Sequence, residues 1–443
     1  MSVAVKLGDP VPPQPLAALA EARERTLGLV AGISDEDLER VHSTLMSPLV
    51  WDLGHIAAFE DLWIAHRHGG RPLLRGDLAD TYDAFETPRA HRGELDHLPP
   101  AQARDYLAEV RARTLEVLAE RGPGDGTIIE LIVRHEHQHG ETMLQTMQLA
   151  RLRGFEPTPP PAPNPESVDA AAPGGDGLAT PSGLELVEVP AGPCLIGAPT
   201  EGFAYDNERP RHRVELPAFR IGRFPVTNGD WLDWIEDGGY GRREWWSSEG
   251  WAWRQAEGAE RPAGWTAELT HEWRLGRCEP LDPRRPVIHV SFHEAEAFAT
   301  ARGLRLPSEL EWEKAASCDP DGDRTLASPW GEDAGEPGTH ANLDQLAGGT
   351  TPVGSLPHSA SPIGCEQMLG DVWEWTASAF DGYPGFRAFP YREYSEVFFG
   401  NEYRVLRGGS WATRARVATV TFRNWDFPQR RQIFAGLRLA ADA

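Results

Sequence analysis

The stretch His135-Glu136-His137-Gln138-His139-Gly140-Glu141 lies in the middle of residues 126–151, where apolar side chains recur at spacings of three and four. That spacing predicts an amphipathic helix. Similar stretches precede it, and prolines occur only at the joints between them. The predicted helices cover residues 16–31, 35–44, 50–67, 101–120 and 126–151. A bundle of about four long helices buries their apolar faces most simply, so an all-α domain is expected over residues 1–154.

The composition changes after this helical region. Residues 155–182 are rich in Pro, Gly, Ala and Ser, which cannot bury enough apolar surface to fold, and they predict a linker. Residues 183–443 contain short β-like runs separated by many Gly and Pro turns. The clearest strands are expected at 184–189, 212–216 and 404–406, and the clearest helices at 227–237, 291–303 and 308–317. This second half is therefore expected to be an α+β domain dominated by loops.

Charge and composition exclude several classes of partner. The chain has 443 residues, with 67 acidic and 43 basic side chains and a formal net charge of −24. Such a charge repels phosphate backbones and anionic lipids, so neither nucleic acid nor membrane is an expected partner. No apolar run reaches the roughly 18 residues of a membrane span, and the N-terminus does not resemble a secretion signal. Four widely spaced cysteines indicate reduced thiols, and we expect a cytoplasmic monomer.

The histidines of the opening stretch suggest a metal site. His135 and His139 are four residues apart, so both project from one face of their helix and can share one ion. A third ligand must come from another helix, and His55, in the helix predicted over residues 50–67, is the best placed. Three neutral imidazoles suit zinc, iron or copper alike. The alternative is a solvated helix face that happens to be rich in histidine.

Residues 135–139 also match the HExxH motif of zinc proteases, in which Glu136 would be the general base. The residues that follow, from Glu141 to Met143, do not continue a metzincin motif. Such a protease also has no need of His55, about 80 residues upstream. The zinc interpretation therefore competes with other metal chemistry at the same histidines.

Several phrases of the second half occur in a characteristic order. They are GPCLIG (192–197) followed by DNERP (206–210), then PVTN (225–228), LPSELEWE (306–313), GDVWEW (370–375), RGGSW (407–411) and GLR (436–438). Together they resemble the formylglycine-generating-enzyme-like domain, which implies a loop-rich fold related to C-type lectins. Genuine formylglycine-generating enzymes carry two copper-binding cysteines soon after the GGS phrase. None occurs here between Trp411 and Val417, so that chemistry is not expected.

The helical half looks like a DinB-type metal-binding bundle, on the HxxxHxE phrase at His135, His139 and Glu141. Three more phrases, MSPLVWDL (46–53), YDAFE (82–86) and FRNWD (422–426), extend the resemblance over nearly the whole chain. In this domain order the chain resembles the iron-dependent sulfoxide synthases of ergothioneine biosynthesis, closest to the actinobacterial branch. The resemblance implies an O2-dependent, non-haem Fe(II) oxidoreductase. Its expected reaction joins the sulfur of γ-glutamylcysteine to C2 of the imidazole of hercynine, Nα-trimethylhistidine, giving γ-glutamyl-hercynylcysteine S-oxide.

In that family the iron is held by a facial triad, which the resemblance assigns to His55, His135 and His139. Three positions would stay open for the thiolate, the hercynine imidazole and dioxygen. Without a carboxylate ligand the iron keeps more positive charge, which favours the anionic thiolate. Glu141 is expected to accept an imidazole N–H in the second coordination sphere, and the alternative is a carboxylate on the helix surface.

The resemblance also implies a proton or hydrogen-atom donor and a site for the dipeptide. Tyr391 falls where the actinobacterial enzymes have their catalytic tyrosine, with Tyr394 expected to shape the pocket, although either phenol could simply be a packing residue. Binding γ-glutamylcysteine requires partners for two carboxylates and an ammonium group. The residues that match the family for this role are Arg89, Arg92, Asp426 and Arg430. The alternative is ordinary surface ion pairing, in which case free cysteine becomes the expected sulfur donor.

The trimethylammonium group of hercynine has no N–H donor and is best held by aromatic faces. Trp425 and Phe427 are the candidates, with Asn424 and Gln138 as polar partners. The whole site is expected at the junction of the two domains, where small-molecule sites often occur. Asn342 is a candidate ligand of a structural calcium ion, which the formylglycine type often binds.

Two other classes of function stay open on the sequence. DinB-type bundles include zinc enzymes that use small thiols, so a zinc-dependent hydrolase or thiol transferase could use the same three histidines. Lectin-like folds often only bind their ligands, which makes a non-enzymatic binding module the second alternative.

Overall fold

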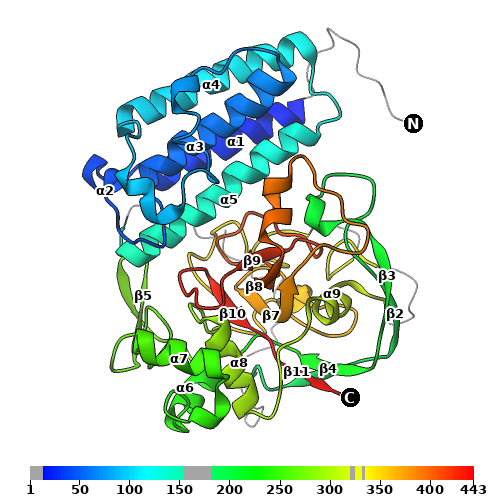
Figure 1. Cartoon of the computed structure of the whole chain (residues 1–443). Helices are drawn as coiled ribbons and strands as arrows, with labels where there is room; N and C mark the ends of the chain where they lie inside the picture. Colours follow the sequence, from blue (N-terminus) through cyan, green and yellow to red (C-terminus); the bar gives the residue numbers. More distant parts are fainter. Residues whose placement is uncertain (1–12, 154–180, 320–324, 332–334) are drawn as a thin grey trace, which may run out of the picture. The chain divides into compact units, whose positions relative to one another are not determined.

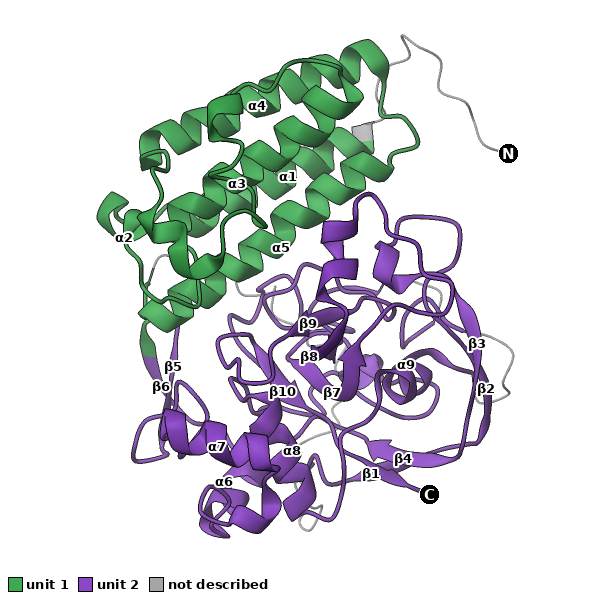
Figure 2. Cartoon of the chain, viewed as in Figure 1, with its two compact units in different colours: residues 1–156, 275–277 green, residues 157–274, 278–443 purple. Residues whose placement is uncertain are grey.

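The computed structural model describes residues 13–153, 181–319, 325–331 and 335–443. The chain divides into two compact units, coloured separately in Figure 2. Unit 1 comprises Met1–Glu156 together with Leu275–Arg277, and unit 2 comprises Pro157–Arg274 and Cys278–Ala443. The predicted linker, residues 155–182, lies outside the described residues except for its last two positions.

Unit 1 is the helical bundle expected from the sequence. Its helices are α1 (Pro13–Val30), α2 (Asp35–Glu39), α3 (Leu49–Glu60), α4 (Pro100–Arg121) and α5 (Thr127–Ala150). Helix α1 packs against α5, and α3 packs against both α4 and α5 (Figure 1). A π-helical segment, Asp61–His68, continues α3, and short 3-10 helices occupy Gly76–Leu78 and Arg89–Glu94. The prediction of a helix over 35–44 was too long, because the backbone at Arg40 is extended.

One charged residue from each long helix meets in the interior of unit 1. Arg23 on α1 donates to Glu60 on α3 and to Glu136 on α5, both at 2.8 Å. Arg111 on α4 donates to the same two carboxylates, at 2.7 and 3.2 Å. A buried charge is tolerated only when it is paired and hydrogen-bonded. These ion pairs therefore cross-link the helices and give the bundle a specific packing.

Unit 2 is a loop-rich α+β fold, as the sequence predicts. Its helices are α6 (Asn228–Glu236), α7 (Ser248–Glu257), α8 (Phe292–Ala301) and α9 (Glu309–Ser317). One sheet has the order β1-β4-β11, from Leu186–Val189, Phe219–Gly222 and Ala440–Asp442. The other has the order β10-β7-β8-β9, from Ala435–Leu437, Trp373–Phe380, Gly400–Arg407 and Asn424–Asp426. Two two-stranded sheets complete it, β2-β3 (Gly192–Ile196 and His212–Leu216) and β5-β6 (His271–Arg274 and Arg277–Pro280), and the first residue of β6, Arg277, belongs to unit 1.

Several sequence motifs of the second half contact one another in the core of unit 2. Arg438 of GLR donates to Glu374 of GDVWEW at 2.9 Å, and the indole of Trp312 donates to the same carboxylate at 2.7 Å. Arg423 of FRNWD donates to Glu309 of LPSELEWE at 2.7 Å. All five side chains are buried. Each buried charge in these motifs therefore has its partner in another motif.

Among the described residues, each helix lacks either the length or the apolar character that is needed to cross a lipid bilayer.

Strong caps explain where three helices of unit 2 begin. The side chains of Thr227, Ser291 and Ser308 each accept a hydrogen bond from the backbone of the first turn, and an acidic residue three positions later reciprocates. Such capping boxes are readable in the sequence, which is why α6, α8 and α9 were predicted to within two residues.

Candidate functional site

Three histidine side chains converge inside unit 1. His135 and His139 lie on α5 and His55 lies on α3, and one ligand nitrogen from each lies within 4.8 Å of the others. The Nε2 atoms of His55 and His135 are 3.1 Å apart. No other group of three His, Cys, Asp or Glu residues in the described part of the chain is close enough to hold a metal ion. The spacing of four on α5 brings two imidazoles together, and the packing of α3 against α5 adds the third.

Two hydrogen bonds orient these imidazoles. Nδ1 of His55 lies 2.7 Å from the carbonyl oxygen of Tyr82, and Nδ1 of His139 lies 2.9 Å from Oδ1 of Asp52. With the proton on Nδ1, each ring donates to its oxygen and turns an Nε2 lone pair toward the other histidines. Sequence reasoning missed both acceptors. A backbone carbonyl has no sequence signal, but Asp52, a charged residue in a predicted apolar helix, could have been noticed.

Because Gly54 has no side chain, the segment that carries Tyr82 can approach α3 closely enough for the Tyr82 carbonyl to reach His55. The Tyr82 ring lies directly on the backbone of α3, and a Cβ atom at Gly54 would be only 2.1 Å from it. The Tyr82 hydroxyl accepts a hydrogen bond from the backbone N–H of Leu98 at 2.9 Å, which holds the segment in place. The residue before His55 is therefore small so that the loop can approach the helix.

Burial keeps two of the three imidazoles neutral. Desolvation, with a smaller contribution from the charge of His139, lowers the pKa of His55 and of His135 well below the usual value of 6.5. A neutral imidazole has the free lone pair that a metal ion requires. At neutral pH these two imidazoles are therefore in the form that binds a metal.

The two glutamates of the motif have different surroundings. Both carboxylate oxygens of Glu136 accept hydrogen bonds from arginines, Oε1 from Arg23 and Oε2 from Arg111. Glu136 is therefore occupied in the bundle interior and is not available as the general base of a zinc protease. Glu141 is buried on α5, and its role as an acceptor of an imidazole N–H stays a prediction.

The two arginines proposed for the dipeptide differ sharply. Arg89 is exposed, whereas Arg92 is buried. Three N–H groups of Arg92 donate to protein oxygens, namely Thr87 O at 2.8 Å, Ser47 Oγ at 2.9 Å and Ala84 O at 3.1 Å. Burial, with repulsion from Arg89, lowers its pKa to about 9, so the group is still a cation at neutral pH. Arg92 thus holds its own loop together.

In unit 2, Tyr391 caps the N-terminus of a short 3-10 helix, Arg392–Tyr394, and Tyr394 is the last residue of that helix. Their rings meet edge to face with centroids 6.2 Å apart, and Tyr394 stacks on Tyr205 at 4.7 Å. The next residue, Ser395, is buried and accepts a hydrogen bond from the Asn207 side chain at 3.0 Å. That anchor ties the tyrosine segment to the DNERP phrase, while both phenols stay partly exposed.

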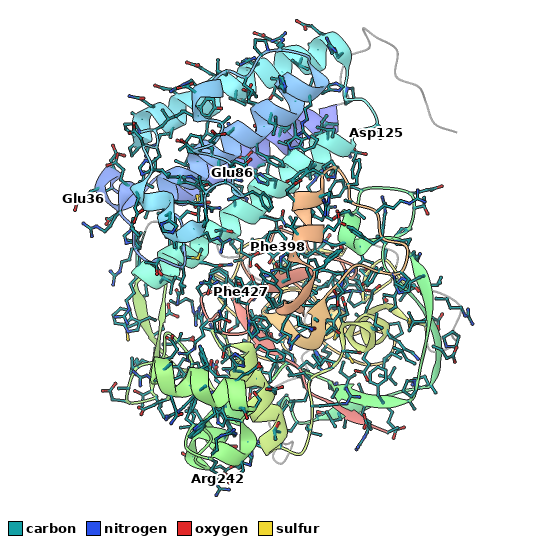
Figure 3. All side chains as sticks on the ribbon, in the orientation of Figure 1. Glu36, Glu86, Asp125, Arg242, Phe398 and Phe427 are labelled. Atoms are coloured by element: carbon teal, nitrogen blue, oxygen red, sulfur yellow. The ribbon has the colours of Figure 1, made fainter. Side chains whose placement is uncertain are left out.

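Strand β9 is at the edge of its sheet and pairs only with β8. Trp425 in its centre stacks on Phe380 at 4.1 Å and approaches Tyr394 edge to face at 6.4 Å. Further rings connect it to Phe427, with Phe398 5.5 Å from Trp425 and Tyr403 4.3 Å from Phe427. Figure 3 labels Phe398 and Phe427. We call Tyr394, Phe398, Tyr403, Trp425 and Phe427 the aromatic cluster. All five are partly exposed, and sequence reasoning missed Phe398 and Tyr403.

Polar candidates lie beside this cluster. Asp426 Oδ2 accepts a hydrogen bond from the Gln432 amide at 3.0 Å, and its Oδ1 lies 3.8 Å from Arg430 Nε. That nitrogen is buried and makes no hydrogen bond to any described residue. Oδ1 of Asn424 accepts from the backbone N–H of Trp425 at 2.9 Å. Arg430 and Asp426 therefore form an ion pair beside the aromatic cluster.

Two remaining candidates are Gln138 and Asn342. Gln138 precedes His139 on α5 and, like it, is partly exposed. The buried Asn342 amide donates to Gly349 O at 2.9 Å and to Asp371 Oδ1 at 2.7 Å. Its donors therefore brace neighbouring loops, and a calcium ion at Asn342 stays a prediction.

Comparison with known proteins covers both halves of the chain. Residues 18–143 match the family described as the DinB superfamily. Residues 177–443 match the family described as the sulfatase-modifying factor enzyme 1-like domain. The order of domains expected from the sequence, a helical bundle followed by a formylglycine-generating-enzyme-like fold, is thereby confirmed.

Three relatives match along almost their full length, and each is named hercynine oxygenase. The protein from Mycolicibacterium thermoresistibile is 48% identical, over 96% of this chain and 94% of its own. The protein from Mycolicibacterium smegmatis is 47% identical, over 96% of this chain and 97% of its own. The protein from Mycobacterium tuberculosis is 46% identical, over 97% of this chain and 99% of its own.

Proposed function

Because the chain belongs to the hercynine oxygenase family, we propose that it joins γ-glutamylcysteine to hercynine oxidatively, with Fe(II) held by the three histidines and O2 as co-substrate. Membership of that family confirms that the chain is an enzyme, so a non-enzymatic binding module is wrong. The observation that carries the metal part of the proposal is the convergence of His55, His135 and His139.

The residues of the cluster fit iron. His55, His135 and His139 would hold the ion through imidazole nitrogens and would leave coordination positions for small ligands, and imidazole is a common ligand of ferrous iron. Fe(II) bound there would supply a redox-active Lewis acid for the reduction of dioxygen. Zinc suits the same donors, but a zinc hydrolase needs a general base, and the pairing of Glu136 with Arg23 and Arg111 argues against one.

The proposed reaction balances without an outside reductant. Hercynine loses the hydrogen on C2, the thiol loses its hydrogen, and a C–S bond forms with release of two electrons. Oxidation of the sulfur to a sulfoxide releases two more. Dioxygen accepts all four electrons, and its atoms end in the sulfoxide and in one water molecule. The products are therefore γ-glutamyl-hercynylcysteine S-oxide and water.

Proton transfer in this reaction is assigned to Tyr391. A phenol exchanges a proton or a hydrogen atom through its hydroxyl oxygen, and general acid catalysis needs such a group within hydrogen-bond reach of the reacting atoms. The anchored 3-10 turn and the edge-to-face contact with Tyr394 limit the movement of the Tyr391 ring. Tyr394 in turn is held by stacking on Tyr205.

Recognition of hercynine is assigned to the aromatic cluster. A quaternary ammonium group offers no hydrogen-bond donor and is attracted to the faces of aromatic rings. Trp425 and Phe427 keep part of their surface exposed while their neighbours hold them in place. The amide groups of Asn424 and Gln138 are the proposed polar partners of the substrate.

Recognition of the sulfur donor rests on Arg430, Asp426 and Arg89. Arg430 is the proposed partner of a substrate carboxylate, and Asp426, 3.8 Å from its Nε, is the proposed partner of an ammonium group. Arg89 is exposed and supplies a second cation. Free cysteine is the second candidate donor, since it carries the same thiol with fewer charged groups to recognise.

Oxygen consumption by the Fe(II)-loaded full chain tests the proposal. Hercynine is supplied with γ-glutamylcysteine or with cysteine, and the products are identified by mass. We expect oxygen uptake that requires both substrates and a product heavier than their sum by one oxygen, less two hydrogens. Turnover with Zn(II) in the absence of oxygen would overturn the oxidase, and equal rates with both thiols would remove the preference for the dipeptide. A His135→Ala variant is the control for iron bound elsewhere.

A further inference from the structure

Two of the three imidazoles lie flat against aromatic rings of one helical stripe. Trp51 and Phe59 lie four residues before and four residues after His55, so all three share a face of α3. The Trp51 ring stacks on His55 with centroids 4.8 Å apart and planes inclined by 12°. The Phe59 ring stacks on His135, on the opposite helix, at 3.7 Å and 10°. Helix α3 therefore supplies His55 itself and the two aromatic rings that stack on His55 and His135.

The Trp51 ring is itself fixed from two sides. Its indole N–H donates to the carbonyl oxygen of Thr81 at 2.8 Å. The guanidinium of Arg92 lies over its ring, 3.7 Å from the centroid, and both side chains are buried. Arg92 cannot easily leave, because its N–H groups are bound to Thr87, Ser47 and Ala84. Arg92, Trp51 and His55 thus form a continuous stack.

Phe59 has similar support from the π-helical segment that continues α3. Trp63, four residues on, contacts its ring with centroids 6.0 Å apart, and Arg67 covers Trp63 at 4.0 Å. His139 differs from the other two histidines, because Asp52 orients it by a hydrogen bond. Each imidazole of the cluster therefore has a specific restraint, either a stacked ring or a carboxylate.

Restraint of this kind matters for metal binding. An imidazole on a flexible side chain can rotate about its terminal torsion, and a metal site needs the lone pairs of several rings to converge. Stacking restricts the rotation before the metal arrives, so less conformational entropy is lost on binding. Changes in such outer partners typically alter metal affinity by about 10- to 100-fold.

We propose that Trp51 and Phe59 are positioning residues that set the ring planes of His55 and His135 for metal binding, and that Arg92 holds Trp51 in place. This inference rests on the proposed function in one respect, that the three histidines bind a metal ion. It assigns Arg92 a position next to the Trp51 ring that stacks on His55, whereas Arg89 is exposed.

Titration of the metal-free full chain with Co(II) tests the inference without any turnover. The ligand-field absorption of bound Co(II) reports the arrangement of its ligands, and the titration gives Kd. We expect Trp51→Leu and Phe59→Leu each to raise Kd by about tenfold or more and to shift the bands. Trp51→Phe keeps an aromatic face and should stay within about threefold of the wild type. Arg92→Met should weaken binding less than Trp51→Leu.

Tyr106→Leu is the matched control. It also replaces a buried aromatic residue of the same bundle, on α4, outside the ring contacts around the histidines. Its Kd and bands should match those of the wild type, and circular dichroism should show every variant helical. If Trp51→Leu fails to fold, Phe59→Leu and Trp51→Phe still decide the question.

The outcomes separate this inference from the proposed function. Wild-type Kd and bands in Trp51→Leu and Phe59→Leu would overturn the inference while leaving the metal site intact. Equal weakening in Tyr106→Leu would also overturn it, because general loss of packing would then be the cause. If the wild type binds no Co(II), or binds it unchanged after His135→Ala, the metal centre itself is wrong.

Discussion

The histidines of unit 1 and the aromatic cluster of unit 2 are built in different ways. His55, His135 and His139 come from two regular helices, and hydrogen bonds or stacked rings restrain each of them. Tyr391 and Trp425, by contrast, come from a 3-10 turn and a three-residue edge strand, and both rings stay partly exposed. The comparison suggests a preorganised metal centre in unit 1 and more adaptable substrate contacts in unit 2. Mutations at the histidine cluster of unit 1 should therefore weaken metal binding, and mutations at the aromatic residues of unit 2 should impair catalysis or substrate recognition.

Loss of a metal ligand should have the largest effect. His135→Ala removes a donor and should reduce metal affinity by more than the roughly 100-fold typical of outer-sphere changes, with product formation falling below detection. Metal analysis of the purified protein and product assay would measure both. His137→Gln, on the same helix but outside the cluster, is the control, and equal loss in that variant would point to damage to α5.

Tyr391→Phe should impair catalysis while leaving the metal centre intact. Removal of a proton donor typically costs about 10²- to 10⁴-fold in rate, whereas the phenyl ring keeps its contact with Tyr394. The measurement is the rate of sulfoxide formation beside Co(II) affinity and the KM of both substrates. Unchanged product formation would exclude Tyr391 from the mechanism, and weakened Co(II) binding would contradict the separation of roles between the units.

Asp52→Asn and Glu141→Gln form a matched pair that decides which carboxylate orients an imidazole. Asparagine at position 52 keeps the volume of the side chain but loses the negative charge of the carboxylate that accepts the hydrogen bond from His139. Metal affinity should therefore fall by about 10- to 100-fold. Glu141→Gln should have a smaller effect if Asp52 is the principal partner. Co(II) titration of both variants gives the comparison, and a larger effect at Glu141 would reverse the assignment.

Trp425→Leu should act on substrate recognition rather than on the metal. A cation–π contact contributes about 0.5 to 2 kcal/mol, so the KM for hercynine should rise by about tenfold, with a smaller change for γ-glutamylcysteine. Steady-state kinetics with each substrate varied in turn would show the difference. An equal rise for both substrates would indicate that strand β9 has lost its pairing with β8.

Two buried histidines of unit 2 should have the smallest effect on activity. Their protonation at low pH should instead lower the free energy of unfolding. Burial lowers the pKa of His289 and of His293 to about 4, against 6.5 for the free side chain. The unfolded chain therefore takes up protons first, and stability present above about pH 6.5 is lost as the pH falls toward 4. Each group should cost about 2 kcal/mol between pH 7 and pH 5.

Urea unfolding at the two pH values measures this loss. His289→Asn is a suitable variant, because the backbone there has a φ of 63° and asparagine tolerates that conformation better than most residues. The variant should lose less stability on acidification than the wild type. The same slope in both proteins would mean that other groups dominate the acid sensitivity.

Local patterns made much of the molecule predictable. Helix α5 and the pairing of His135 with His139 follow from a spacing of three and four, and α8 and α9 from their capping serines. Helix α7 was not predicted, and α2 was predicted too long. The sequence assigns no role to Asp52, because its burial beside His139 depends on the packing of α3 against α5. Arg89 and Arg92 were indistinguishable in sequence, yet one is exposed and the other lies over Trp51.

The sequence by itself determined the two kinds of domain, the order of the main helices, the family and the candidate ligands, because those depend on periodicity and motifs within short segments. Tertiary structure alone decided which atoms orient the imidazoles, which aromatic rings lie behind them, and which glutamate is bound to arginines. These contacts join residues that are tens of positions apart in the chain. They depend on how helices and loops pack, and packing is a property of the folded chain as a whole.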